Sequence, residues 1–223
     1  MKPEDGIAHA FAAALNNSVE LATAIGAVWA STPAFSEDRH RAAQGLCAIS
    51  LHHGQAVLSL LPALPASAIA LVRPQYECLV RAVWAMHAAT DAQLQRLLAP
   101  LTIESQHAAK KLPGVPEMLE KLAESGPLGA AALLSRARDQ LNDGLNSFVH
   151  GGIHPFARHH AGYPISLLMD VLKNSNALGM LTLHVLTAMP EQDEAVVLMP
   201  ALHAEFSDVL PSLEPLPSAA RSP

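Results

Sequence analysis

Residues 66–90 carry apolar side chains on nearly every side of the helix that their spacing predicts. Large apolar residues fill one broad face, and smaller ones fill the opposite side. The remaining stripe holds Arg73, Glu77, Arg81 and Trp84, spaced i, i+4, i+8 and i+11. A helix that is apolar almost all round lies at the centre of a bundle. We therefore expect this helix to be central and its charged stripe to be at least partly enclosed.

The rest of the chain shows the same apolar spacing of three to four residues, without the alternation typical of β-strands. Helices are expected over 5–30, 38–62, 66–90, 92–111, 115–124, 128–149, 164–189 and 192–210. No internal repeat or long linker divides the chain. The sequence thus predicts an all-α fold, a single bundle of long antiparallel helices over residues 1–210 with a short helical insertion near 113–127. Residues 211–223 are expected to form a disordered Pro-rich tail.

Composition excludes several classes of protein. Half of the 223 residues are hydrophobic and 15% are charged, which does not fit a disordered chain. Two cysteines are too few for a disulfide scaffold. The formal net charge of −6 argues against a global basic surface for nucleic acid, although local basic clusters occur at Arg39–Arg41 and around Arg158.

The N-terminus lacks the basic and apolar regions of a signal peptide, so a cytoplasmic location is expected. Between Arg41 and Arg73 the chain has no charged residue, but histidines and prolines interrupt the apolar run, so no membrane span is predicted there. Alanine-rich helices pack closely, and so high an apolar content predicts a homodimer.

The segment 141–152, LNDGLNSFVHGG, predicts a helix that ends at a double glycine. Its polar stripe holds Asn142, Asn146 and His150 at i, i+4 and i+8. Three interpretations of His150 remain open: a cap for the last carbonyls of the helix, a general acid or base, or a metal ligand.

The following stretch, GGIHPFARHHAGYP, is rich in histidine and arginine and is expected to form a loop. His154 and Arg158 are its candidate binding residues, and the loop either covers a pocket or forms a solvated turn. Because no acidic residue accompanies the histidines, no metal site is predicted, and no cofactor is implied.

Two buried polar stripes in one bundle are most easily satisfied when they face each other. We therefore predict a single polar pocket holding Arg73, Glu77 and His150 as candidate catalytic residues. Arg81 and Asn146 are expected at its edge, and Trp84, His154 and Arg158 complete the candidate binding set. The alternative is a purely structural Arg–Glu–Arg ladder along the helix.

The blocks RPQYECLVRAVW at 73–84 and LNSFVHGG at 145–152 resemble a family of uncharacterised bacterial all-helical domains of unknown function. The resemblance spans residues 60–210 and includes Ser175 and Asn176. More distantly, the chain resembles HEPN-type helical bundles, many of which are metal-independent ribonucleases. That group carries an arginine four to six residues before its histidine, where this sequence has Asn146 four residues before His150.

Three functions follow as hypotheses. The first is a module of bacterial stress or defence type that interacts with a cognate protein partner. The second is a bundle that binds a small anionic ligand in the Arg/Glu/His pocket. The third is a HEPN-like ribonuclease acting on RNA, with His150 as acid or base and Arg73 or Arg81 stabilising the phosphorane.

Overall fold

The computed structural model describes residues 3–189 and 193–212. Within this part of the chain all regular structure is helical, with ten α-helices, one short 3-10 turn and no strand, which confirms the all-α prediction. The helices are α1 (Pro3–Ser31), α2 (Asp38–Leu60), α3 (Pro65–His87), α4 (Asp91–Leu98), α5 (Ile103–Ala109), α6 (Val115–Ser125), α7 (Ala130–Val149), α8 (Ile153–Ala161), α9 (Ile165–Thr187) and α10 (Asp193–Glu205), followed by η1 (Ser207–Val209). From residue 213 on, the predicted tail lies outside the described residues.

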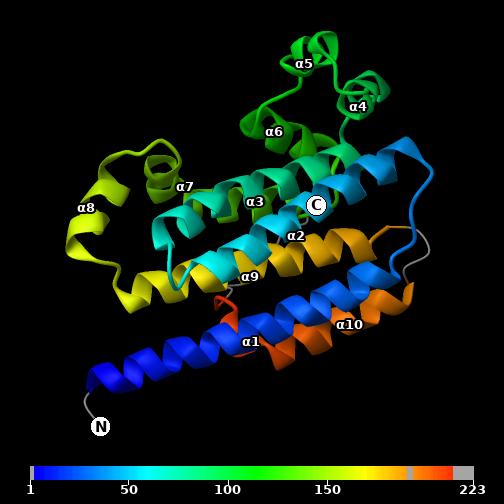
Figure 1. Ribbon diagram of the computed structural model, residues 1–223. Coiled ribbons are helices and arrows are strands. Elements are labelled where there is room, and N and C mark those ends of the chain that lie inside the picture. The colour runs from blue at the N-terminus through cyan, green and yellow to red at the C-terminus, as the bar shows by residue number, and fades with distance from the viewer. Residues whose placement is uncertain (1–2, 190–192, 213–223) are drawn as a thin grey trace, which may run out of the picture.

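The central helix is α3, as its sequence predicts. It packs against α2, α6, α7 and α9, so neighbours surround it on several sides (Figure 1). Leu79, Val80 and Trp84 are almost completely buried. Burial on so many sides explains why this segment has no broad polar face.

The long helices do not all alternate in direction. α2 and α3 form an antiparallel pair, whereas α1 and α9 run side by side in the same direction (Figure 1). These two helices approach closely at Gly179, where an added Cβ would lie 3.4 Å from the Cδ1 atom of Ile25. Gly179 of α9 therefore lies directly against the Ile25 side chain of α1.

A buried polar network ties α3 to α2 and α9. The side chain of Gln75 is fully buried; its Nε2 donates to the Ser175 carbonyl at 2.9 Å, and its Oε1 accepts from Ser175 Oγ at 2.8 Å. Ser50 Oγ on α2 donates to the backbone carbonyl of Gln75 at 2.9 Å. Gly54 leaves room for this amide, because a Cβ there would lie 2.8 Å from Gln75 Nε2. The network therefore satisfies a polar side chain in the centre of the bundle.

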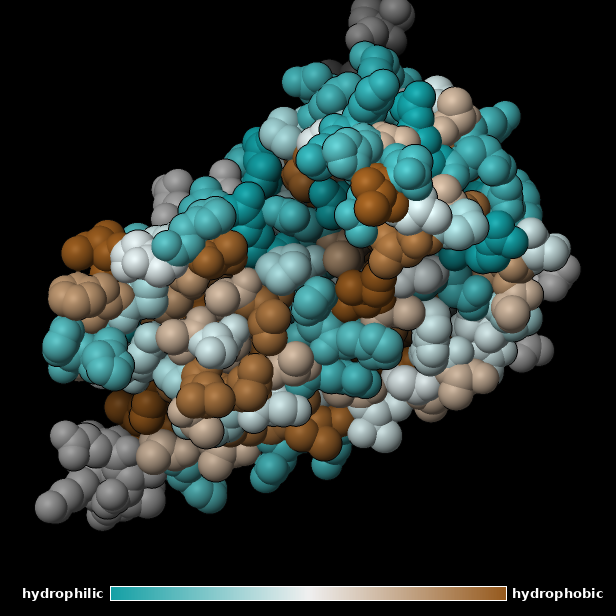
Figure 2. All heavy atoms as spheres, turned by 45° about the horizontal axis from the view of Figure 1, so that its top comes forward, coloured by the Kyte–Doolittle hydropathy of each residue, from teal (hydrophilic) through white to brown (hydrophobic). Residues whose placement is uncertain are grey.

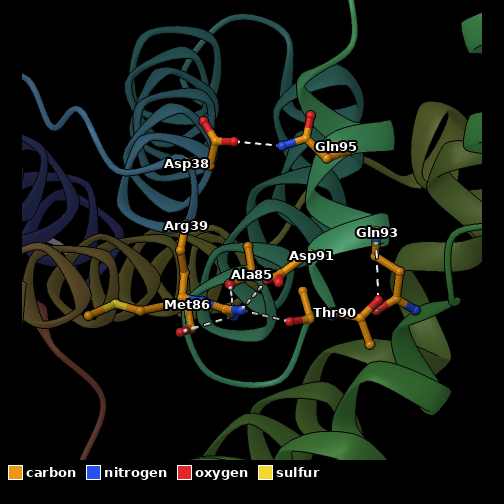
Figure 3. A network of polar contacts seen from close by, with 9 residues as sticks. Asp38, Arg39, Ala85, Met86, Thr90, Asp91, Gln93 and Gln95 are labelled. Atoms are coloured by element: carbon orange, nitrogen blue, oxygen red, sulfur yellow. Dashed lines mark hydrogen bonds and ion pairs between the residues drawn. The ribbon is translucent and has the colours of Figure 1, made fainter.

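Arg39 at the start of α2 closes the carboxyl end of α3 (Figure 3). Its guanidinium donates to the carbonyl oxygens of Ala85 at 2.9 Å and Ala89 at 3.0 Å, and more weakly to that of Met86 at 3.5 Å. The last carbonyls of a helix lack partners within the helix, so Arg39 supplies them with donors. Asp91 lies 3.6 Å from the same guanidinium. This arginine, part of an apparent basic cluster in the sequence, therefore has a structural role.

The helix expected over 92–111 is wrong as one element, because the chain forms α4 and α5 separately. Pro100 lies between them, and a proline disfavours helix at the residue before it and removes a backbone donor. Thr102 then starts α5 with its side chain accepting from the backbone of Ser105. The predicted insertion at 113–127 contains α6, which packs against α3 and α7, while α4 and α5 contact each other at the top of Figure 1.

The loop expected after His150 is also wrong, because Ile153–Ala161 forms the helix α8. The chain turns at Gly151, whose φ of 64° suits glycine, and Gly152 precedes the new helix. Pro155 occupies the first turn of α8, where proline is tolerated.

α1 lies at one edge of the bundle and buries Leu21 and Ile25 in the core. By length and composition, its Gly6–Ser31 segment is the one helix of the described residues that is long and apolar enough to cross a membrane. A helix packed along one face of a bundle meets the same criteria. Ile7 and Val19 on α1 are about half exposed, and hydrophobic residues reach the surface at several places on the face shown in Figure 2.

Candidate anion-binding site

Three of the residues singled out in the sequence line one cavity of about 230 Å³. Arg73 and Glu77 reach it from α3, and Asn146 reaches it from α7. Val115 and Pro116, at the start of α6, form part of its wall. The cavity therefore lies where the central helix meets α6 and α7, so two polar stripes distant in sequence meet here.

Arg73 and Glu77 form an ion pair along one turn of α3. Nε of Arg73 donates to Oε1 of Glu77 at 2.8 Å. The two side chains remain 33% and 27% exposed, so water reaches the pair. Arg81 makes no ion pair or side-chain hydrogen bond within the described part of the chain, so the alternative Arg–Glu–Arg ladder stops after its first pair.

Tyr76 forms an apolar wall of the cavity and joins α3 to α7. Its hydroxyl donates to the backbone carbonyl of Leu134 at 2.9 Å. Burial raises the pKa of Tyr76, and the nearby guanidinium of Arg138 opposes this shift only in part. The phenol is therefore a neutral hydrogen-bond donor at neutral pH, with a structural partner.

Arg138 is the cavity residue that sequence reasoning missed. It lies on α7 and contributes a second guanidinium to the lining. Its Nε donates to Oδ1 of the neighbouring, largely exposed Asp139 at 3.0 Å. The signal was present in the sequence, because Arg138 lies two turns before Asn146 and extends the stripe of Asn142 and Asn146 by one turn.

His150 does not line the cavity. α7 ends at Val149, and His150 is the residue after it, with its backbone N–H bonded to the Asn146 carbonyl at 3.2 Å. Its side chain is exposed and makes no hydrogen bond or ion pair within the described residues. Residues four apart share a face only within a helix. Because α7 ends at Val149, His150 does not follow Asn146 into the cavity lining.

The other predicted binding residues also lie away from this cavity. Trp84 is 1% exposed and belongs to the hydrophobic core, while Arg81 is partly exposed further along α3. His154 and Arg158 lie on α8, and the ring of His154 stacks near Phe148 with 6.4 Å between ring centres. None of these residues lines the cavity with Arg73 and Glu77.

Among the described side chains, no group of three or more His, Cys, Asp or Glu residues is arranged to hold a metal ion. The two cysteines are separate from the cavity lining. Cys47 is fully buried and Cys78 is half-buried, and burial raises the pKa of both thiols. Neither cysteine is therefore an activated nucleophile.

Residues 47–212 match the model of a family of unknown function, DUF6988. The chain belongs to this family. The match confirms the resemblance to a family of unknown function that was drawn from the two blocks at 73–84 and 145–152. It does not show a relation to HEPN-type bundles. No curated protein and no solved structure matches the chain.

In this DUF6988 protein the described lining of the cavity offers donors and one carboxylate. Arg73 and Arg138 carry positive charge, Glu77 carries negative charge, and Asn146 adds an amide. The described lining includes no histidine, serine or cysteine that would serve as a general base or nucleophile. Such a set provides hydrogen-bond donors for an oxyanion beside the Glu77 carboxylate.

Proposed function

We propose that this protein binds a small organic anion in the cavity between α3, α6 and α7. The observation that supports the proposal is the convergence of two guanidinium groups, Arg73 and Arg138, on one cavity. Glu77 is the one carboxylate in the described lining and pairs with Arg73, while Asp139, outside the lining, pairs with Arg138 at 3.0 Å. A guanidinium has five N–H donors, so each arginine keeps donors beyond its ion pair. Guanidinium groups bind carboxylates and phosphates with two parallel hydrogen bonds, which favours an oxyanion as the ligand.

The size of the cavity limits the ligand. Its volume of about 230 Å³ is smaller than the roughly 300–1,000 Å³ typical of drug-sized ligand sites. The leucines at 141 and 145 supply part of an apolar wall. A compact molecule with one phosphate group or one or two carboxylate groups fits these features better than an RNA strand, which needs an extended basic surface.

The direct test is calorimetric titration with inorganic phosphate and with succinate as probes. We expect saturable binding of at least one probe, and a loss of affinity of tenfold or more in Arg138→Gln, because a charged hydrogen bond contributes about 1.5–3 kcal/mol. Arg158→Gln is the matched control, because Arg158 lies on α8 outside the cavity, and it should bind as the wild type does. Absence of binding, or equal losses in both variants, would contradict the proposal.

The ribonuclease alternative has less support, because His150 lies outside the cavity that holds Arg73. The variant His150→Ala separates the two functions. Anion binding should be unchanged in it, whereas RNA cleavage that disappears with this substitution would favour the ribonuclease.

A homodimer remains a prediction, as do a cognate protein partner, a role in stress or defence, and a cytoplasmic location without membrane attachment. The exposed hydrophobic residues Ile7 and Val19 on α1 support self-association. Light scattering at micromolar concentration should give about 47 kDa, twice the chain mass of 23.6 kDa. A mass near that of one chain would reject the dimer.

A further inference from the structure

A second and larger cavity lies on another side of α7, with a volume of about 400 Å³. α7, α9 and α10 line it together with Leu210 and Pro211, near the end of the described chain. It is separate from the proposed anion site, and Leu141 is the residue that borders both cavities. Its volume falls within the range of about 300–1,000 Å³ typical of small-molecule sites.

The lining of this cavity is mostly hydrocarbon. Leu133 on α7, Leu181 on α9 and Met199 on α10 contribute apolar side chains from three different helices. An apolar body enclosed by all three helices would lose its contact with water, which favours binding in proportion to the apolar area buried.

The polar groups at the same cavity share one property. The described lining includes Arg136, His184 and His203, with the amides of Gln140 and Asn174, and it includes no aspartate or glutamate. Arg136 is positively charged and already interacts with a partner, and the histidines and amides supply further hydrogen-bond donors. The cavity therefore complements a molecule with an apolar body and one anionic head group.

We propose that this cavity binds a medium-chain carboxylic acid, with the acyl chain among the leucine and methionine side chains and the carboxylate toward Arg136. A carboxylate suits this place because a guanidinium binds it through two hydrogen bonds. His184 on α9 and His203 on α10 also line the cavity and add hydrogen-bond donors to it. The site is independent of the anion site at Arg73.

The test is calorimetric titration of the full chain with hexanoate, octanoate and decanoate. Each buried methylene should tighten binding by about threefold to fourfold until the cavity is full. Decanol, which has the same tail without the charge, should bind at least tenfold more weakly than decanoate. Affinity that does not change with chain length, equal affinity for decanol, or no saturable binding of decanoate would each overturn the proposal.

Substitutions locate the binding. Ala177→Leu fills the cavity from α9 and should weaken decanoate binding by at least tenfold. Ala22→Leu makes the same change in the apolar groove between α1 and α2 and should leave the affinity unchanged. Arg136→Gln serves as a second variant that alters only the head-group end. Thermal unfolding checks that each variant is folded, and decanoate binding that survives both Ala177→Leu and Arg136→Gln would overturn the proposal.

The two sites are distinguished within the same experiment. Arg138→Gln should lose phosphate or succinate binding and keep decanoate binding, because Arg138 does not line the larger cavity. If the protein binds neither phosphate nor succinate at the Arg73 cavity, decanoate binding at the larger cavity is still tested independently.

Discussion

Two sides of α3 carry polar side chains, and their surroundings differ. On the side of α2 and α9, Gln75 is fully buried, and its amide exchanges two hydrogen bonds with Ser175. On the side of α6 and α7, Arg73 and Glu77 keep about a third of their surface exposed and border a cavity. The Gln75 network is therefore closed to water, whereas the Arg73–Glu77 pair is open to it.

The difference follows from the cost of burial. A neutral amide is buried at little cost when both its ends are paired, whereas a charge taken out of water is costly unless its partner geometry is excellent. α3 therefore keeps its neutral group inside and leaves its charges near water. A closed network holds helices together, while a half-open pair of charges is able to receive a ligand. The predictions below test this division, from the largest expected effect to the smallest.

Gln75→Ala should lower the free energy of unfolding by about 3 kcal/mol, because it removes two buried hydrogen bonds and leaves a hole. Urea denaturation measures the effect. Gln55→Ala on α2 is the matched control, because Gln55 is exposed, and it should change stability by less than about 0.5 kcal/mol. Similar losses in the two variants would mean that the closed network contributes nothing specific.

Arg39→Ala extends the comparison to a charged group that is 26% exposed and donates to backbone carbonyls. It leaves the carbonyls of Ala85 and Ala89 without their donor and should cost about 2 kcal/mol. Arg41 provides the control: its exposed pair with Asp38 is expected to contribute less than about 1 kcal/mol. Thermal unfolding of Arg39→Ala and Arg41→Ala should therefore separate the two arginines, and equal midpoints would refute the structural role of Arg39.

Tyr76→Phe removes the hydrogen bond to Leu134 and should cost about 1 kcal/mol near pH 8. Burial raises the pKa of Tyr76 above its ordinary value of 10.0, so the unfolded chain loses this proton first as pH rises. The contribution of the phenol is thus complete below pH 10 and declines above it. Urea denaturation at pH 8 and pH 10.5 should show a smaller difference between the two proteins at the higher pH. A difference that grows with pH would contradict this account.

Glu77→Gln should have the smallest effect on folding. Full burial of Arg73 would make the loss about 3–5 kcal/mol, but the exposure of both partners reduces it to about 1 kcal/mol or less. The same variant should bind phosphate or succinate more tightly, because it removes the one carboxylate of the described lining. Calorimetry measures the affinity for the probe, and urea denaturation of the same preparation measures the stability. A loss of stability of about 3 kcal/mol or more would mean that the Arg73–Glu77 pair behaves as a buried ion pair.

Much of the fold was predictable from local patterns. The apolar spacing of residues 66–90 predicted a central helix, and α3 is central. The errors came from local breaks that compete with a good helical pattern, at Pro100 between α4 and α5, and from a helix that restarts after Gly151 and Gly152. The stripe of Arg73 and Glu77 and the stripe of Asn146 were also visible, because helical spacing alone puts such residues on one face.

The partners of these stripes were not predictable in the same way. Gln75 pairs with Ser175, a hundred residues away, and no local pattern distinguishes this glutamine from a surface one. Arg39 and Arg41 look alike in the sequence, yet one caps α3 and the other pairs at the surface. Arg138 joined the cavity and His150 did not, because α7 ends before His150 and packs against α3 through the turns that precede it.

The sequence by itself therefore determined the long helices and their apolar faces, since both depend on residues within a few turns of each other. Only the tertiary structure decided that Gln75 is closed to water and that Arg73 and Glu77 are open to it. That outcome depends on which helices pack together, and the free energy of burying a polar group depends on the partner that packing provides.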